Sequence, residues 1–431
     1  MECDLDTLLV FLETAGCPAE TAAALARDVP LTAQGIAPAT GAALAVVLAE
    51  ALGLPAAPET LVQEGSLDDW LDFVAQRRDD AALKRAAMAR ITNGKASIPS
   101  GKAYVIETMR PADAPGVAAL FHTIYDANYP VLDYYVPEKL IALNRQKAVL
   151  TLVSRLETGE IAGHGAYYRS SPPNPAVYEQ GQLLVDPAYR QSSMAFKLLR
   201  ELDAVSYAMP WAEAFWGEAV CNHVVTQKSG DKQGYTPCGI ELSLMPDAAY
   251  AKEGATGRVS CMMGWRVHCD KPLPLHLPEV YRPVVEGILS GFSLRRDIRF
   301  GAGDRPAAGE TVLDSRLFDL AQVERVQVAA VGQDFPAHVA ALEERAVRLG
   351  LAVVQVAINA SSPGTAWAAQ TLRQRGYVFG AFAPLWFPDG DALMLQRLAA
   401  EPNFEAVNLY TDRAKAILAH IRQEWGARGR W

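Results

Sequence analysis

From residue 103 onward, short β-branched or aromatic runs alternate with longer helical patterns. This alternation limits the possible folds more than any other feature of the sequence. A strand that is repeatedly followed by a helix builds a sheet covered by helices, so we predict an α/β (α+β) sheet domain here. The expected strands are residues 104–107, 148–155, 160–169, 177–185 and 214–225, and the expected helices are residues 111–125 and 189–206.

The same order of elements returns later in the chain. The earlier segment ends in a polar turn and Gly234-Tyr235, and the later one has Gly376-Tyr377 at the corresponding place. Self-similarity of this kind is typical of internal duplication. The later elements are strands at 326–331 and 351–358, helices at 336–349 and 365–375, and a strand that follows Gly376-Tyr377 to residue 384.

Residues before 103 have a different pattern, rich in Ala and Leu at helical spacing. We expect a small helical bundle, which runs through a charged helical extension into a linker that ends at Pro99-Ser100-Gly101. The predicted domains are residues 1–80, a linker at 81–102, a first sheet domain at 103–255, a second at 256–400 and a helical tail at 401–431.

Composition excludes several functional classes. Of the 431 residues 50% are hydrophobic, which is enough for large cores, and the net charge of −9 disfavours a nucleic-acid-binding surface. None of the six cysteines forms a CxxC pair, so we expect no metal site and free thiols. The acidic start and the lack of a long apolar run indicate a cytoplasmic protein without a membrane span.

The most informative stretch runs from Tyr178 to Leu199. It contains Val185-Asp186-Pro187-Ala188-Tyr189-Arg190 at the end of a predicted strand, followed by a polar loop and a predicted helix. This resembles the central motif of the Gcn5-related N-acetyltransferase (GNAT) superfamily, in which main-chain amides at a helix N-terminus bind the diphosphate of acetyl-CoA or another acyl-CoA. The resemblance assigns this binding to Arg190, Gln191, Ser192, Ser193, Met194 and Ala195.

The resemblance extends over residues 104–398 and is stronger in its first half. Gly159 to His164 matches a Gly-x-x-x-Gly-His strand of the same group, and residues 363–367 and 390–397 resemble its C-terminal half. The fold that it implies is two GNAT-like mixed-sheet domains in tandem. The second is expected to be degenerate, because no Arg-x-x-Gly-x-Gly loop occurs near residues 333–335.

The front domain, over about 75 residues, resembles an acyl or peptidyl carrier protein. Residues 31–54 and 66–71 fit the family's pattern, but Ala37-Pro38 stands where the family has Asp-Ser. Proline has no hydroxyl, so this domain cannot carry phosphopantetheine. Two alternatives remain open: the domain docks an acyl-carrier protein or synthase partner, or it is an unrelated three-helix cap.

Acyl transfer to an amine needs a base, and the candidates are Glu179, His164 and His223. Amides near Leu184 and Val185 would polarise the thioester carbonyl. The tyrosine that serves as general acid in the family is missing. Gly230 stands at its position in the first domain, and Leu372 stands there in the second. The thiolate would leave unaided, or water or another tyrosine would protonate it.

The resemblance therefore implies an N-acyltransferase that acts on an amine of a small-molecule substrate, in specialised metabolism. Two alternatives stay open. One is a non-catalytic acyl-CoA-binding or carrier-docking protein of a biosynthetic assembly line, which the missing serine and tyrosine favour. The other is a GNAT-fold decarboxylase of a malonyl thioester.

Overall fold

The computed structural model describes residues 3–94, 97–127, 129, 131–246 and 257–427. The chain divides into two compact units, each described here by itself. The first unit comprises residues 1–168 and 181–206, and the second comprises residues 169–180 and 207–431. Both units combine helices with strands, the large sheet has parallel and antiparallel pairs, and a helical region precedes the strands, so the predicted fold class is confirmed.

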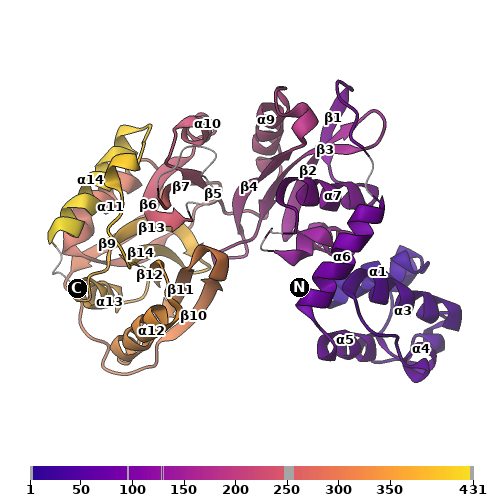
Figure 1. Ribbon diagram of the computed structural model, residues 1–431. Coiled ribbons are helices and arrows are strands. Elements are labelled where there is room, and N and C mark those ends of the chain that lie inside the picture. The colour runs from indigo at the N-terminus through magenta and orange to yellow at the C-terminus, as the bar shows by residue number, and fades with distance from the viewer. Residues whose placement is uncertain (1–2, 95–96, 128, 130, 247–256, 428–431) are drawn as a thin grey trace. The chain divides into compact units, whose positions relative to one another are not determined.

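The front of the first unit is a bundle of helices (Figure 1). Local capping explains where two of them begin: Asp4 accepts a hydrogen bond from the Thr7 amide at 2.9 Å, and Ser66 and Asp69 form a capping box. Leu8, Phe11, Leu44 and Trp70 face inward and are buried. The helices are α1 (Leu5–Thr14), α2 (Ala19–Ala23), α3 (Pro38–Leu52), α4 (Glu59–Glu64), α5 (Leu67–Gln76) and α6 (Asp80–Gly94).

Pro38 is the first residue of α3, and Ala37 precedes it at the N-cap position. Proline suits the first turn of a helix because its missing N–H would have no partner there. The bundle packs on the rest of the first unit through buried polar contacts. Lys139 donates to Asp4 and to the Thr7 hydroxyl, both at 3.2 Å.

The sheet of the first unit has the strand order β1-β2-β3-β4. The pairs β1–β2 and β2–β3 are antiparallel, with Ile106 opposite Ser154 and Val153 opposite His164. Its strands are β1 (Tyr104–Thr108), β2 (Val149–Leu156), β3 (Ile161–Tyr168) and β4 (Val177–Val185), and its helices are α7 (Ala114–Tyr125), α8 (Pro137–Arg145) and α9 (Met194–Ser206).

The second unit contains the start of β4, through Gln180, and all later strands. Its large sheet has the order β4-β5-β7-β6-β13-β14-β12-β11-β10, and β8 pairs with β9 separately. The strands are β5 (Ala214–Val220), β6 (Thr236–Met245), β7 (Val259–Val267), β8 (Leu273–Pro278), β9 (Arg296–Gly301), β10 (Val312–Phe318), β11 (Val323–Ala330), β12 (Val353–Asn359), β13 (Val378–Phe387) and β14 (Gly390–Leu398).

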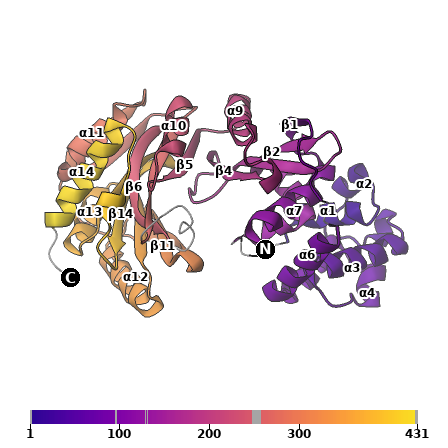
Figure 2. The same ribbon diagram turned by 45° about the horizontal axis from the view of Figure 1, so that its top comes forward.

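Helices cover this sheet, and α14 packs on β6 and β13 (Figure 2). The helices are α10 (Val225–Lys232), α11 (Arg282–Leu289), α12 (Phe335–Leu349), α13 (Thr365–Gln374) and α14 (Asp412–Ala427). No helix among the described residues is both long and apolar enough to cross a membrane.

Apart from the edge strand β10, the strand order in the first half of the second unit's large sheet returns in reverse in its second half. The segment β4-β5-β7-β6 corresponds to β11-β12-β14-β13, and β4–β5 and β11–β12 are its parallel pairs. Gly234 and Gly376 precede β6 and β13 with φ of 77° and 80°. The amides of Tyr235 and Tyr377 each donate to the carbonyl five residues earlier, at 3.0 and 3.1 Å.

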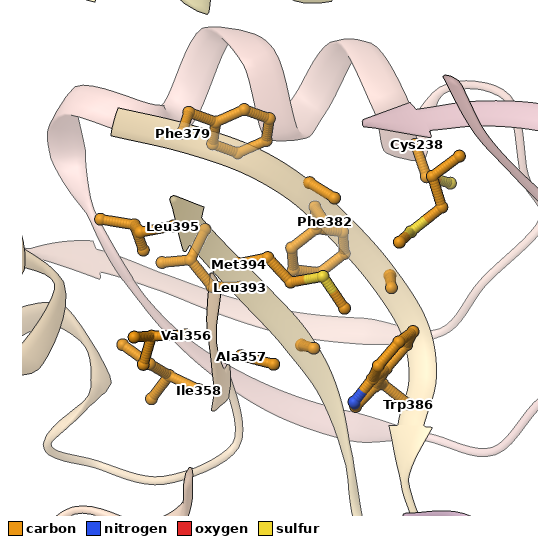
Figure 3. Close-up of a cluster of buried hydrophobic side chains, with 14 of the residues drawn as sticks. Cys238, Val356, Ala357, Ile358, Phe379, Phe382, Trp386, Leu393, Met394 and Leu395 are labelled. Carbon is orange, nitrogen blue, oxygen red and sulfur yellow. The ribbon is translucent and has the colours of Figure 1, made fainter. Parts of the chain in front are cut away.

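The core of the second unit is aromatic and aliphatic, and Figure 3 shows part of it around β12, β13 and β14. Trp216, Trp265 and Trp386 lie in this core and are fully buried. Their ring centroids are 5.5 to 5.8 Å apart. Because these tryptophans come from β5, β7 and β13, the curvature of the sheet brings distant strands together.

Two expected boundaries are wrong. The helix predicted at 189–206 begins only at Met194, because Pro187–Tyr189 forms a short 3-10 helix and a turn follows it. The strand predicted at 214–225 ends at Val220, and residues from Val225 form α10.

Candidate active site

The connection between β4 and α9 belongs wholly to the first unit. Asp186 Oδ1 accepts a hydrogen bond from the Ala188 amide at 2.9 Å, which starts the 3-10 turn. The Asp186 amide donates to the Ala162 carbonyl of β3 at 2.8 Å. This anchoring fixes the end of the strand, so that the following loop leaves the sheet at a defined point.

The loop itself consists of exposed residues up to the start of α9. Arg190, Gln191, Ser192 and Ser193 are exposed, while Met194 is buried against the sheet. The Ser193 carbonyl accepts the first bond of the helix from the Lys197 amide at 2.9 Å. Ser193 is therefore the N-cap residue.

The first-turn amides of Ala195 and Phe196 have no helical carbonyl before them. These amides and the positive end of the helix dipole can bind an anion, and every side chain from Arg190 to Ala195 is neutral or basic. The loop residues of the predicted acyl-CoA motif thus lie together at one helix N-terminus. Leu184 is buried and Val185 half-buried at the end of β4.

Strand β4 is distorted at Gln182, which has φ of 54°. A positive φ is unfavourable for glutamine and marks an irregular strand. The Gln182 carbonyl accepts a hydrogen bond from His164 Nδ1 at 2.8 Å, and Gln182 Nε2 donates to the Tyr129 hydroxyl at 3.1 Å. Gln182 thus connects β4 to β3 and to the segment after α7 at this irregularity.

The three predicted base candidates occupy different surroundings. His164 is fully buried in β3, and burial lowers the pKa of its imidazole to about 4, so it is neutral at pH 7. His223 lies in the turn between β5 and α10. Glu179 is half-buried on β4 opposite Trp216 of β5, in the second unit. His164 therefore belongs to the first unit, whereas Glu179 and His223 belong to the second.

A second group of charged residues lies in the interior of the second unit. Arg325 of β11 donates to Glu241 of β6 at 2.6 Å and to Glu218 of β5 at 3.3 Å. It also donates to Gln355 at 2.7 Å and to Ser171 at 2.6 Å. Arg325, Glu241 and Glu218, together with Gln355, are called the Arg325 cluster below.

The members of the Arg325 cluster differ in exposure. The side chains of Arg325 and Glu241 are 5% and 2% exposed, whereas that of Glu218 is 15% exposed. Burial and then the charge of Glu218 raise the pKa of Glu241 well above its ordinary value. Glu241 can hold a proton at neutral pH beside a second, more accessible carboxylate, and such pairs are typical of acid–base chemistry.

Replacing Glu241 with glutamine tests this protonation. An acid whose pKa is raised by folding contributes stability at low pH, and this stability is lost as pH rises from the unfolded value of 4.5 through the raised value. For one proton the slope is at most about 1.4 kcal/mol per pH unit. We expect urea unfolding between about pH 5 and 8 to show a smaller decline in E241Q than in the wild type.

The exposed Glu344 provides the control for this experiment. E344Q should keep the wild-type pH dependence, since Glu344 lies on the surface of α12. Equal slopes for the wild type and E241Q would show that Glu241 is already ionised at neutral pH.

Sequence reasoning missed the Arg325 cluster. Glu241 lies between buried residues of β6, and Glu218 lies between half-buried residues of β5. A charged residue inside an otherwise apolar strand was the one available signal. The partner arginine could not be found this way, because it is 107 residues from Glu218 in the chain.

No group of three or more His, Cys, Asp or Glu that could hold a metal ion occurs among the residues that the structure describes. The cluster contains a guanidinium and two carboxylates, which are held by hydrogen bonds and ion pairs.

Comparison with known proteins gave matches to solved structures. No protein-family model matches the chain, and no curated protein matches it. Similar structures include a Desulfovibrio desulfuricans protein described as an acetyltransferase of the GNAT family, with 12% identity, 38% of this chain and 99% of that chain covered, and a TM-score of 0.29.

Two further similar structures are N-acetyltransferases. The ribosomal-protein-S18-alanine N-acetyltransferase of Escherichia coli is 16% identical, with 39% of this chain and 95% of that chain covered and a TM-score of 0.29. The spermidine/spermine N-acetyltransferase of Vibrio cholerae is 10% identical, with 38% and 95% covered and a TM-score of 0.30.

Proposed function

We propose that this protein is an N-acyltransferase that moves an acyl group from acetyl-CoA or another acyl-CoA to an amine of a small molecule. The observation that carries the proposal is the turn from Arg190 to Ala195. It follows an irregular strand, starts a helix, is exposed from Arg190 to Ser193, and contains no acidic side chain. Such a turn provides what a diphosphate needs, namely main-chain amides, a helix dipole and a nearby cation.

In the proposed reaction the amine nitrogen attacks the thioester carbonyl carbon. A C–N bond forms, the C–S bond breaks, and the thiolate of coenzyme A leaves. Amides near Leu184 and Val185 polarise the carbonyl, and a base accepts the proton lost by the amine. We assign this proton to His164, because this predicted base lies in the same unit as the loop, is neutral at pH 7 and has no hydrogen-bond partner at Nε2 among the described residues.

We also propose that the second unit contains the remnant of a duplicated GNAT-like domain. The matching strand order, parallel pairs and Gly-Tyr turns support it. β11 pairs with β12 over six residues, from Val323 to Val328, whereas β4 pairs with β5 over three, from Val177 to Glu179. The later copy therefore serves as a structural half, and its β11 supplies Arg325.

Binding of acyl-CoA tests the proposal. Acetyl-CoA at about 100 times its Kd should stabilise the folded protein by about 2.7 kcal/mol, which is seen as a higher melting temperature. S193D places a carboxylate at the N-cap, where it repels the diphosphate, so we expect its Kd for acetyl-CoA to be at least about tenfold higher.

The control is S290D, which adds the same charge at an exposed serine of the second unit. It should bind acetyl-CoA as the wild type does. If no member of a panel of acyl-CoA thioesters stabilises the wild type, the transferase function is excluded.

A non-catalytic acyl-CoA-binding protein is the second candidate. It is favoured by Gly230 in α10 and the buried Leu372 in α13, because these residues stand where the family has the tyrosine that acts as general acid. Acyl-CoA binding without release of coenzyme A in the presence of any amine, together with capture of a carrier protein, would identify it.

A further inference from the structure

A cavity of about 380 Å³ lies over one face of β10 and β11 in the second unit. The segment from Ser170 to Pro173 and the side chain of Phe387 close its sides. Its volume is at the lower end of the range for small-molecule sites. The residues that line its sheet face alternate along the two strands, as expected for side chains on one side of a sheet.

Two arginines face each other on this surface. Arg316 of β10 and Arg325 of β11 are direct Cα partners in the antiparallel register, and both line the cavity. Like charges directly opposite each other on neighbouring strands are unfavourable unless a counter-charge is present. The charge of Arg325 is matched by Glu241 and Glu218.

Arg316 has no such counter-charge. It packs over the Phe318 ring at 5.1 Å from the centroid and makes no ion pair with any residue that the structure describes. An exposed guanidinium beside an aromatic ring at a cavity wall offers its donors as a fork, which fits a carboxylate.

The remaining polar groups of the cavity suit an ammonium group and a further polar group on a ligand whose carboxylate binds Arg316. Asp314 lies two residues before Arg316 on the same strand, opposite Gln327, and lines the cavity. The Ser170 hydroxyl is buried and has no hydrogen-bond partner among the described residues. The cavity therefore combines a cation with an acceptor for an ammonium group and a hydroxyl that lacks a partner.

We propose that this cavity binds an amino acid. Its carboxylate would pair with the Arg316 guanidinium, its ammonium group with Asp314, and Ser170 would donate to or accept from the ligand. Phe318 and Phe387 provide apolar walls for the side chain. The assignment does not depend on acyl transfer, because every residue that it uses belongs to the second unit.

Isothermal titration of the full chain tests the assignment. The probes are the standard amino acids and the amines that lack the carboxylate, such as agmatine for arginine, cadaverine for lysine and tyramine for tyrosine. We expect at least one amino acid to bind and its matched amine to bind at least about tenfold more weakly. R316Q should weaken amino-acid binding by about tenfold or more, because a charge-assisted bidentate pair is lost.

The control variant is R299Q, which removes an exposed arginine of β9 in the same unit. It should bind the amino acid as the wild type does. The assignment is overturned if no amino acid binds at about 10 mM, a millimolar limit for weak binding. It is also overturned if the amines bind equally well, or if R299Q and R316Q lose the same affinity.

Discussion

Replacing Arg325 with methionine is expected to lower the free energy of unfolding by about 1–3 kcal/mol, because it leaves the buried oxygen atoms of the Arg325 cluster without their hydrogen-bond donor. Arg325 is 5% exposed and donates to Glu241, Glu218, Gln355 and Ser171. Methionine has a similar length and fills the same space, so lost packing contributes little. Urea or guanidinium unfolding at pH 7 measures the change.

A matched set of variants separates this charge effect from packing. R299M removes an exposed arginine of the same unit, and we expect it to stay within about 0.5 kcal/mol of the wild type. Adding E241M to R325M should restore part of the lost stability, because apolar side chains at both positions leave no buried polar group without a partner. A loss below about 1 kcal/mol in R325M would mean that the cluster is not held together by its guanidinium.

The second large effect is expected on turnover. If His164 accepts the amine proton, H164Q should lower kcat by about 10²- to 10⁴-fold while the Kd for acyl-CoA remains unchanged. The side-chain amide of glutamine can keep the hydrogen bond to the Gln182 carbonyl, but it cannot take up a proton. Release of the coenzyme A thiol with a panel of small amines measures the rate.

Three comparisons show whether the loss is specific. E344Q changes an exposed carboxylate of α12 and should leave kcat unchanged. E179Q tests another predicted base, and a larger loss there than in H164Q would assign the proton to Glu179. The rate of the wild type should rise with pH as the imidazole of His164, whose pKa burial lowers to about 4, loses its proton, and H164Q should lose this dependence. A kcat of H164Q within a few-fold of the wild type would remove His164 from the mechanism.

Much of the local structure follows from the sequence. The strands at residues 148–155, 160–169 and 177–185 were expected within one residue of β2, β3 and β4, because β-branched runs between turn residues determine them locally. The start of α9 was expected too early. Asp186 and Pro187 favour a separate 3-10 turn, and their side-chain chemistry overrides the apolar pattern that continues through it.

The sequence by itself determined the alternation of strands and helices, the repeated Gly-Tyr turns and the polar loop at residues 190–193, since each depends on neighbours within a few residues. Only the tertiary structure decided which charged residues meet. Arg325 is 84 residues from Glu241 and 107 from Glu218 in the chain, yet it donates to both. The curvature of the large sheet brings β11 over β5 and β6, and sequence periodicity describes the face of one strand without specifying which distant strand lies opposite.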